Sequence, residues 1–183
     1  SVSNPLMGSA VFAKEAGKAL RKKILTLEFG DSITFTSFGD GRIDHLPEKS
    51  LQISRRMPAR QAAELVEGEI RSFSKNREGD GATHMLSFFE DRNFGCDKPG
   101  TEIWVISDAL ENSDALNSNQ LVKGKALPKP FTQNLKGCAV TIIGAGLQGD
   151  RPLSREMRQN IHKVWTDWLT LAGATRVTIR MNP

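Results

Sequence analysis

The sequence predicts an α/β protein with a doubly wound, mainly parallel sheet, helices on both faces and one short antiparallel edge strand. Two observations support this fold class. Segments with the composition of buried strands alternate along the chain with amphipathic helical segments, which is the element order of parallel α/β sheets. In addition, residues 103–106 are apolar at every position, as in a parallel strand that is covered on both faces. We therefore expect this strand at the centre of the sheet.

The first third of the chain predicts one helix followed by two strands. Apolar side chains recur at helical spacing over residues 12–24, and either Asn4 or Ser9 can cap this helix. Residues 33–38 are dense in β-branched and aromatic side chains, which favours a strand. Residues 51–54 are short and alternating, which favours the antiparallel strand at the sheet edge.

The middle of the chain predicts helical segments on either side of a glycine-rich loop. Pro58 opens a helix whose apolar stripe runs over residues 62–73. The loop, residues 78–83, leads into a short helix at residues 85–89. Thr83 is well placed to cap that helix.

The last part of the chain predicts a loop, a strand, a helix and a final strand. Residues 112–130 are polar with weak periodicity, so a short helix and then a loop are expected. Residues 138–144 read as a second fully apolar strand. Ser154 caps the last helix and Gly173 ends it. The buried face of that helix is expected to hold Met157, Ile161, Trp165, Trp168 and Ala172. Residues 176–180 alternate as in a strand near the sheet edge.

The composition indicates one domain, residues 1–183, in a reducing compartment. The formal net charge of +4 is small and dispersed, so nucleic-acid binding is not supported. No apolar stretch approaches the ~20 residues of a membrane span, and the first residues show no signal-peptide pattern. Cys96 and Cys138 form no CxxC pattern, which favours free thiols over the alternative of a single disulfide. We expect a soluble, cytoplasmic protein.

Motifs for catalysis are weak in this chain, and we do not expect an enzyme. Gly144 to Gly149 match GxGxxG directly after an apolar strand, as in dinucleotide-binding proteins. However, residues 150–152 interrupt any helix that begins at these glycines, and the next strand does not end in the acidic residue that binds a ribose. The histidines show no HExxH spacing, and Ser107 lies outside any GxSxG motif.

Four oxygen-bearing side chains are expected to converge at one end of the sheet: Ser1, Ser3, Thr83 and Asp108. Asp108 follows the strand at 103–106, and the carboxyl ends of parallel strands form the crevice in which open α/β sheets bind ligands. Hydroxyl and carboxylate oxygens are hard donors that suit Mg²⁺ or Mn²⁺. Taken singly, Asp108 can instead shape a turn, Thr83 can cap a helix, and the serines can belong to a disordered terminus.

At these residues the chain resembles the von Willebrand factor A-type (vWA) domain with its metal-ion-dependent adhesion site (MIDAS). That site is built from a DxSxS sequence after the first strand, a threonine in a later loop and an aspartate in a strand-terminal SDG or TDG. Residues 1–3 are similar to the SxS, residues 81–83 to the threonine loop, and residues 107–109 to the last element. The order of predicted elements is similar over nearly the whole chain.

Two departures from the family pattern have structural consequences. Ala109 replaces the usual glycine, and the aspartate of DxSxS, with the strand that carries it, would precede Ser1. The resemblance therefore implies a vWA-like domain truncated at its N-terminus, with a slot between the strands at 33–38 and 103–107. A first-strand segment from the upstream chain or from a second copy is expected to fill this slot, because unpaired apolar edges recruit strands.

The resemblance implies a non-enzymatic protein-interaction module, in which Mg²⁺ or Mn²⁺ at the MIDAS-like site binds an acidic residue of a protein partner. Two alternatives remain open. One is a nucleotide- or NAD-dependent enzyme that uses the loop Gly144–Gly149. The other is a structural vWA-like domain without a metal.

Overall fold

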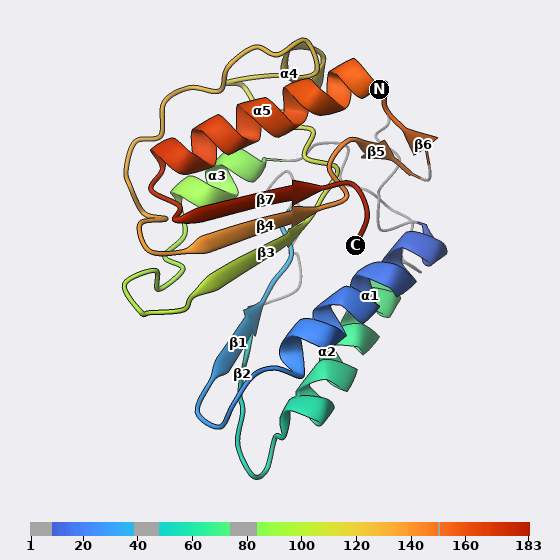
Figure 1. Cartoon of the computed structure of the whole chain (residues 1–183), viewed down its shortest axis with the longest axis vertical. Coiled ribbons are helices and arrows are strands. Elements are labelled where there is room, and N and C mark those ends of the chain that lie inside the picture. The colour runs from blue at the N-terminus through green and yellow to red at the C-terminus, as the bar shows by residue number, and fades with distance from the viewer. Residues whose placement is uncertain (1–8, 39–47, 74–83, 150) are drawn as a thin grey trace.

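The computed structural model describes residues 9–38, 48–73, 84–149 and 151–183. Within these residues the fold is α/β (Figure 1). Its main sheet holds the parallel strands β3 (Glu102–Ile106), β4 (Ala139–Ile143) and β7 (Arg176–Arg180), in the order β3-β4-β7. The α/β class and the parallel pairing predicted from the sequence are confirmed.

One face of the main sheet carries the larger hydrophobic core. The helices α3 (Met85–Glu90) and α5 (Arg155–Leu171) contribute side chains to this core, together with the inward residues of all three strands. Trp165 and Trp168 are buried there, and their indole N–H groups donate to the carbonyl oxygens of Ala109 and Pro128, both at 2.9 Å. The predicted aromatic stripe of α5 is therefore core packing. Met157, predicted on the same face, is 38% exposed, and that prediction is wrong.

The other face of the sheet is only partly covered. The helix α1 (Ala10–Ile24) packs Phe12 and Ala16 against Ile143 of β4, with Trp104 and Ile106 of β3 partly buried beside them. The side chains of β7 on this face, at residues 176, 178 and 180, are exposed. Helices thus contact both faces, but the coverage of the second face stops short of β7.

Among the described residues β3 lies at an edge of the main sheet and β4 is central, so the expected central position of the strand at 103–106 is wrong for the sheet that the structure describes. Ile103 and Val105 face the larger core, whereas Trp104 and Ile106 face α1. An unbroken run of apolar residues indicates that both faces of a strand are covered. It does not report whether a neighbouring strand lies on each side.

The first half of the chain forms a separate layer around a second core. The strands β1 (Ser32–Phe35) and β2 (Lys49–Gln52) pair antiparallel, and α1 packs on α2 (Ala59–Phe73) beside them (Figure 1). The antiparallel strand predicted at residues 51–54 is confirmed in part, because the observed strand covers residues 49–52, and its predicted place at the edge of the main sheet is wrong among the described residues. The pair does not join the main sheet, since β1 and β3 share no ladder.

Helix caps follow the predictions where the structure describes them. Ser9 and Ser154 accept the backbone N–H of the third helical residue of α1 and α5, and Gly173 at φ +98° follows the last turn of α5. The short helix α4 (Ser118–Leu121) lies where a short helix was expected. Asn4 and the cap candidate Thr83 lie outside the described residues. The N-cap position of α3 is His84, whose side chain does not cap.

Cys96 and Cys138 form a disulfide, so the expectation of free thiols is wrong. Their Cα atoms are 4.9 Å apart because Cys138 immediately precedes β4, and a turn returns Cys96 to the adjacent end of β3. The amide of Ala139 donates to the carbonyl oxygen of Thr101 at this end of the two strands. The spacing of the two cysteines in the sequence does not show that the strand ends carrying them lie side by side.

Candidate cation site at the carboxyl end of β3

Of the four predicted cation ligands, the structure describes only Asp108. Ser1, Ser3 and Thr83 lie outside the described residues, so their convergence on Asp108 stays a prediction. Asp108 lies in the loop directly after β3, at the carboxyl end of the parallel sheet. Its side chain is 7% exposed. The predicted position of Asp108 at the strand end is confirmed.

Local hydrogen bonds fix the loop that carries Asp108. The Ser107 hydroxyl accepts the amide N–H of Ala109 at 3.1 Å, and Asp108 Oδ1 accepts the amide N–H of Leu110 at 3.0 Å. The Asp108 carbonyl oxygen accepts the amide N–H of Gly146 at 2.8 Å, which ties the loop to the end of β4. Asp108 therefore shapes a turn, as its simpler interpretation predicts, and its carboxylate accepts backbone N–H groups within that turn.

Ala109 has a left-handed backbone conformation, with φ +60°. This conformation costs an L-residue about 1 kcal/mol or more, whereas glycine adopts it readily. The Ala109 carbonyl oxygen accepts the Trp165 indole N–H, and its side chain is fully buried, so the surrounding core holds the strained residue in place.

The Asp108 carboxylate is electrostatically uncompensated within the described chain. Burial raises the pKa of Asp108 from 3.8 to about 6, although backbone hydrogen bonds from Leu110 and from Asp108 itself favour the ionised form. No salt bridge joins Asp108 to a basic side chain of the described residues. At neutral pH the site thus holds a buried negative charge without a positive partner in the described part of the chain.

The Asp108 loop offers oxygen donors of the type that a divalent cation prefers. A carboxylate oxygen and the second lone pair of the Ser107 hydroxyl are hard donors. Among the described residues no group of three His, Cys, Asp or Glu side chains could enclose a metal. A cation here would therefore depend on hydroxyl ligands, water and the residues of the partner.

Glu111 is a second buried carboxylate in the same loop, and the sequence predictions missed it. Its side chain is fully buried, and its Oε2 accepts the amide N–H groups of Met85 at 2.8 Å and Leu86 at 3.1 Å. Burial raises the pKa of Glu111, while these hydrogen bonds oppose the rise. Glu111 thus caps α3 from a distance. The detectable signal is that His84 is a poor N-cap residue, so the cap must come from elsewhere.

The glycine-rich loop after β4 has a structural role in the described chain. The amides of Gly144 and Ala145 donate to the Arg180 carbonyl oxygen, and that of Gly146 to the Asp108 carbonyl oxygen. The chain then forms the short strands β5 (Leu147–Gln148) and β6 (Arg151–Pro152) before α5 begins. These amides are already used, and no helix starts at the glycines. The loop therefore lacks the phosphate cradle of a dinucleotide-binding turn.

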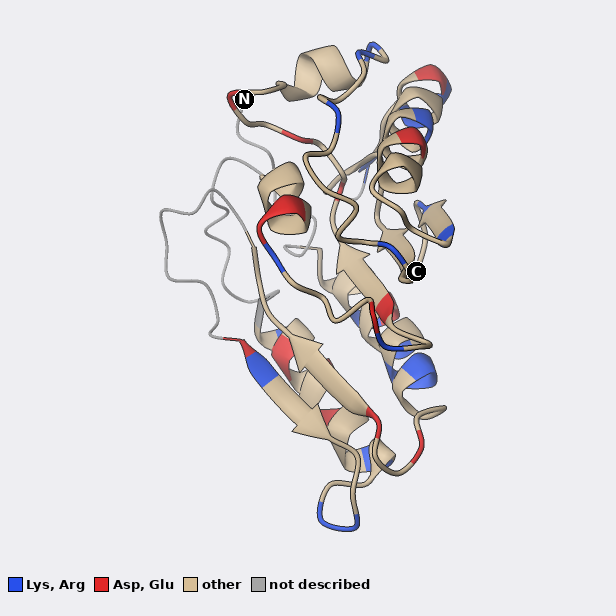
Figure 2. Ribbon diagram, turned by 90° about the vertical axis from the view of Figure 1, so that its left-hand side faces the viewer, with Lys and Arg blue, Asp and Glu red and all other residues tan. Residues whose placement is uncertain are grey.

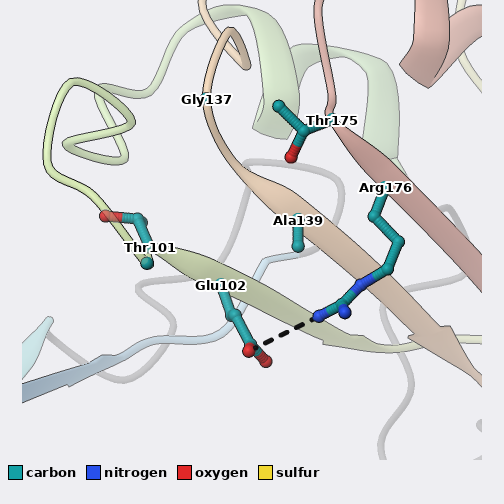
Figure 3. Close-up of a pocket in the computed structure, with 7 residues that line it drawn as sticks. Thr101, Glu102, Gly137, Ala139, Thr175 and Arg176 are labelled. Atoms are coloured by element: carbon teal, nitrogen blue, oxygen red, sulfur yellow. Dashed lines mark ion pairs between the residues drawn. The ribbon is translucent and has the colours of Figure 1, made fainter.

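The opposite end of the main sheet holds a shallow pocket of about 280 Å³ (Figure 3). It opens at the first residues of the three strands, Glu102, Ala139 and Arg176. The hydroxyls of Thr101 and Thr175 donate to backbone carbonyl oxygens. This pocket offers no set of free donors comparable to the Asp108 loop.

Comparisons with protein-family models, curated proteins and solved structures found no match to this chain. No helix in the described part of the chain is both long and apolar enough to cross a membrane.

Proposed function

We propose that this chain is a non-enzymatic protein-interaction module that binds an acidic residue of a partner through Mg²⁺ or Mn²⁺ held at Asp108. The observation that carries this proposal is the buried Asp108 carboxylate, with a pKa of about 6 and no basic partner among the described residues. A divalent cation would remove the cost of that buried charge. A cation with few protein ligands would also keep coordination positions for a partner's carboxylate.

The vWA resemblance gives the proposal its structural frame. Ala109 has a left-handed conformation that glycine adopts readily, which supports the proposal that this loop corresponds to the SDG turn of the family. We propose that the three parallel strands belong to a doubly wound vWA-type sheet, whose remaining strand would lie between β1 and β3.

Unpaired backbone groups on the outer edge of β3 support the proposal that a further strand lies there. On its inner side, β3 bonds to β4 through the Ser107 amide, which donates to the Ile143 carbonyl oxygen, and through the Thr101 carbonyl oxygen, which accepts the Ala139 amide. In a parallel ladder the residues of one strand point alternately toward and away from the neighbouring strand. The backbone N–H and C=O groups of Glu102, Trp104 and Ile106 therefore point away from β4. They have no backbone partner among the described residues. We propose that an extended segment, from the upstream chain or from a second copy, pairs here. Light scattering separates these sources, because only the second predicts a dimer of this chain.

Metal titration tests the proposed cation site. Mg²⁺ or Mn²⁺ should raise the melting temperature of the wild-type chain, and Asp108→Asn should abolish the rise. Asp114→Asn, an exposed residue of the following loop, is the matched control and should respond as the wild type does. A rise that persists in Asp108→Asn contradicts the proposal. NAD is titrated in parallel, because a response to NAD alone favours the nucleotide-dependent alternative, and no response to either favours a structural domain without a metal.

The Cys96–Cys138 disulfide indicates the kind of cellular compartment in which the chain works. Disulfides persist in oxidising environments and are rare in the cytoplasm. We infer that the chain works in an oxidising compartment, in preference to the cytoplasmic location expected from the sequence. The mass of the protein after alkylation of free thiols, measured on protein taken from its native source, tests this. Two alkylated cysteines would contradict the inference.

A further inference from the structure

A groove of about 510 Å³ separates α1 from the uncovered part of the main sheet. Its lining residues come from α1 and the turn after it, from β3, and from the end of β7 and the residues that follow: Glu15, Lys18, Ala19, Lys22, Lys23, Thr26, Trp104, Arg180 and Pro183. It is distinct from the Asp108 loop, because no residue of that loop lines it.

Basic side chains occupy both walls of the groove. Over much of the described chain, basic and acidic residues are interspersed (Figure 2). Here, by contrast, Lys18, Lys22 and Lys23 line one wall and Arg180 the other, against the single carboxylate of Glu15. Because the like charges are close to each other, the groove favours a negatively charged occupant.

Two of these cations are available for an external ligand. Lys18 pairs with Glu15 at 2.7 Å, and Lys23 pairs with Glu102 at 2.8 Å. Lys22 and Arg180 have no acidic partner within the described residues, and both are exposed. An acidic ligand would therefore gain two unpaired cations without breaking an ion pair.

The floor of the groove continues onto a polar sheet face. Arg176 lies 3.6 Å from Glu102, and Figure 3 shows the two side chains reaching toward one another past Ala139. Thr178 on the same face is exposed. An apolar helix would remove this ion pair and the Thr178 hydroxyl from water without adding a hydrogen bond, which is costly. A ligand with its own carboxylates would not incur this cost.

Trp104 argues against single-stranded nucleic acid as the occupant. Binding of single strands depends on aromatic faces that stack with bases. The Trp104 ring packs in the cluster of Phe12 and Ala16, and the Arg180 guanidinium lies over the ring, 5.7 Å from its centroid. Its indole N–H donates to Glu102 at 3.1 Å. Both the stacking surface and the polar atom of Trp104 are already used.

We propose that this groove binds an acidic peptide segment of a protein partner, with Lys22 and Arg180 as its principal contacts. This surface goes beyond the function proposed above, because it needs no divalent cation. The charge complementarity is the argument for the occupant: unpaired cations on two opposite walls suit carboxylates spaced along a peptide.

Fluorescence anisotropy with a labelled octaglutamate peptide, in EDTA, tests the proposal. The wild-type chain should bind the peptide, and Lys22→Glu/Arg180→Glu should weaken binding about tenfold or more. Lys123→Glu/Lys125→Glu makes the same charge change at two exposed lysines away from the groove and should weaken binding less than about threefold. Lys22→Glu alone changes an exposed helix position and serves if the double variant does not fold.

Three results would overturn the proposal: no binding of octaglutamate by the wild type, an equal loss in the control variant, or tighter binding of an oligothymidylate of eight nucleotides than of the peptide. Asp108→Asn should leave peptide binding unchanged. This separates the groove from the cation site, since each can fail while the other holds.

Discussion

Replacing Asp108 by asparagine should stabilise the metal-free protein at neutral pH. The carboxylate is 7% exposed and its pKa is raised to about 6 by burial, so folding opposes its ionisation. Asparagine keeps an oxygen that can accept the Leu110 amide, now 3.0 Å from Oδ1, and removes the charge.

The magnitude follows from the pKa gap between the folded and the unfolded chain. A rise from 3.8 to about 6 corresponds to about 3 kcal/mol of destabilisation once Asp108 is ionised in both states. The penalty is absent below about pH 4, grows between about pH 4 and 6, and is constant above that range. An unpaired asparagine N–H would offset about 1 kcal/mol, so the net gain at pH 8 should be about 2 kcal/mol.

Urea denaturation in EDTA at pH 4 and pH 8 measures this difference. The free energy of unfolding of Asp108→Asn should exceed that of the wild type by about 2 kcal/mol at pH 8 and by close to zero, or less, at pH 4. Asp114→Asn should show no such pH dependence. A variant that is less stable than the wild type at pH 8 would show that Asp108 is a structural turn residue whose charge is compensated, and would refute the reasoning.

Three further predictions concern the frame of the site. Glu111→Leu should lower the free energy of unfolding by about 2 to 4 kcal/mol, because two buried amides lose their acceptor. Glu111→Gln keeps an acceptor oxygen and should lower the free energy of unfolding less. Equal losses of stability in urea denaturation would contradict the capping role. Gly137→Ala should be severely destabilising, because the added Cβ would clash with the Cys96 carbonyl oxygen. The control Gly30→Ala places its Cβ more than 4 Å from any atom and has only the cost of a positive φ. Similar melting temperatures for the two variants would contradict this prediction. Removing both cysteines should cost about 2 to 4 kcal/mol, given the sequence separation of 42 residues that the disulfide closes, and a variant as stable as the oxidised wild type would argue against the bond.

The helices could be predicted because their signals are local. The apolar stripe of α1 and the caps at Ser9, Ser154 and Gly173 each depend on residues within one or two turns. Met157 is the exception: it has the right spacing, but it lies in the first turn of α5, and 38% of its surface is exposed.

The lateral order of the strands could not be read from the sequence. Residues 103–106 are covered on both faces, which their composition predicts, yet β4 and not β3 is central. Hydrogen bonds between strands use backbone groups that every residue carries, so composition does not identify the neighbour. The Cys96–Cys138 disulfide escaped prediction for the same reason, since it depends on which strand ends meet.

For the candidate site, the position of Asp108 was predictable and its environment was not. A polar residue after an apolar run indicates a strand end. Ala109 is held by the indole of Trp165 in α5, and Glu111 caps α3, so the environment of the loop depends on both helices. These contacts join residues far apart in sequence.

Paramagnetic broadening by Mn²⁺ in amide NMR spectra tests the central claim most directly. At substoichiometric Mn²⁺, a cation held at Asp108 should broaden the amide signals of Ser107, Asp108 and Leu110 first, and excess Mg²⁺ should restore them. Asp108→Asn should remove the selective broadening. If exposed carboxylates such as Asp114 and Asp167 broaden first, or if the loop signals stay sharp, the chain does not hold a cation at the end of β3.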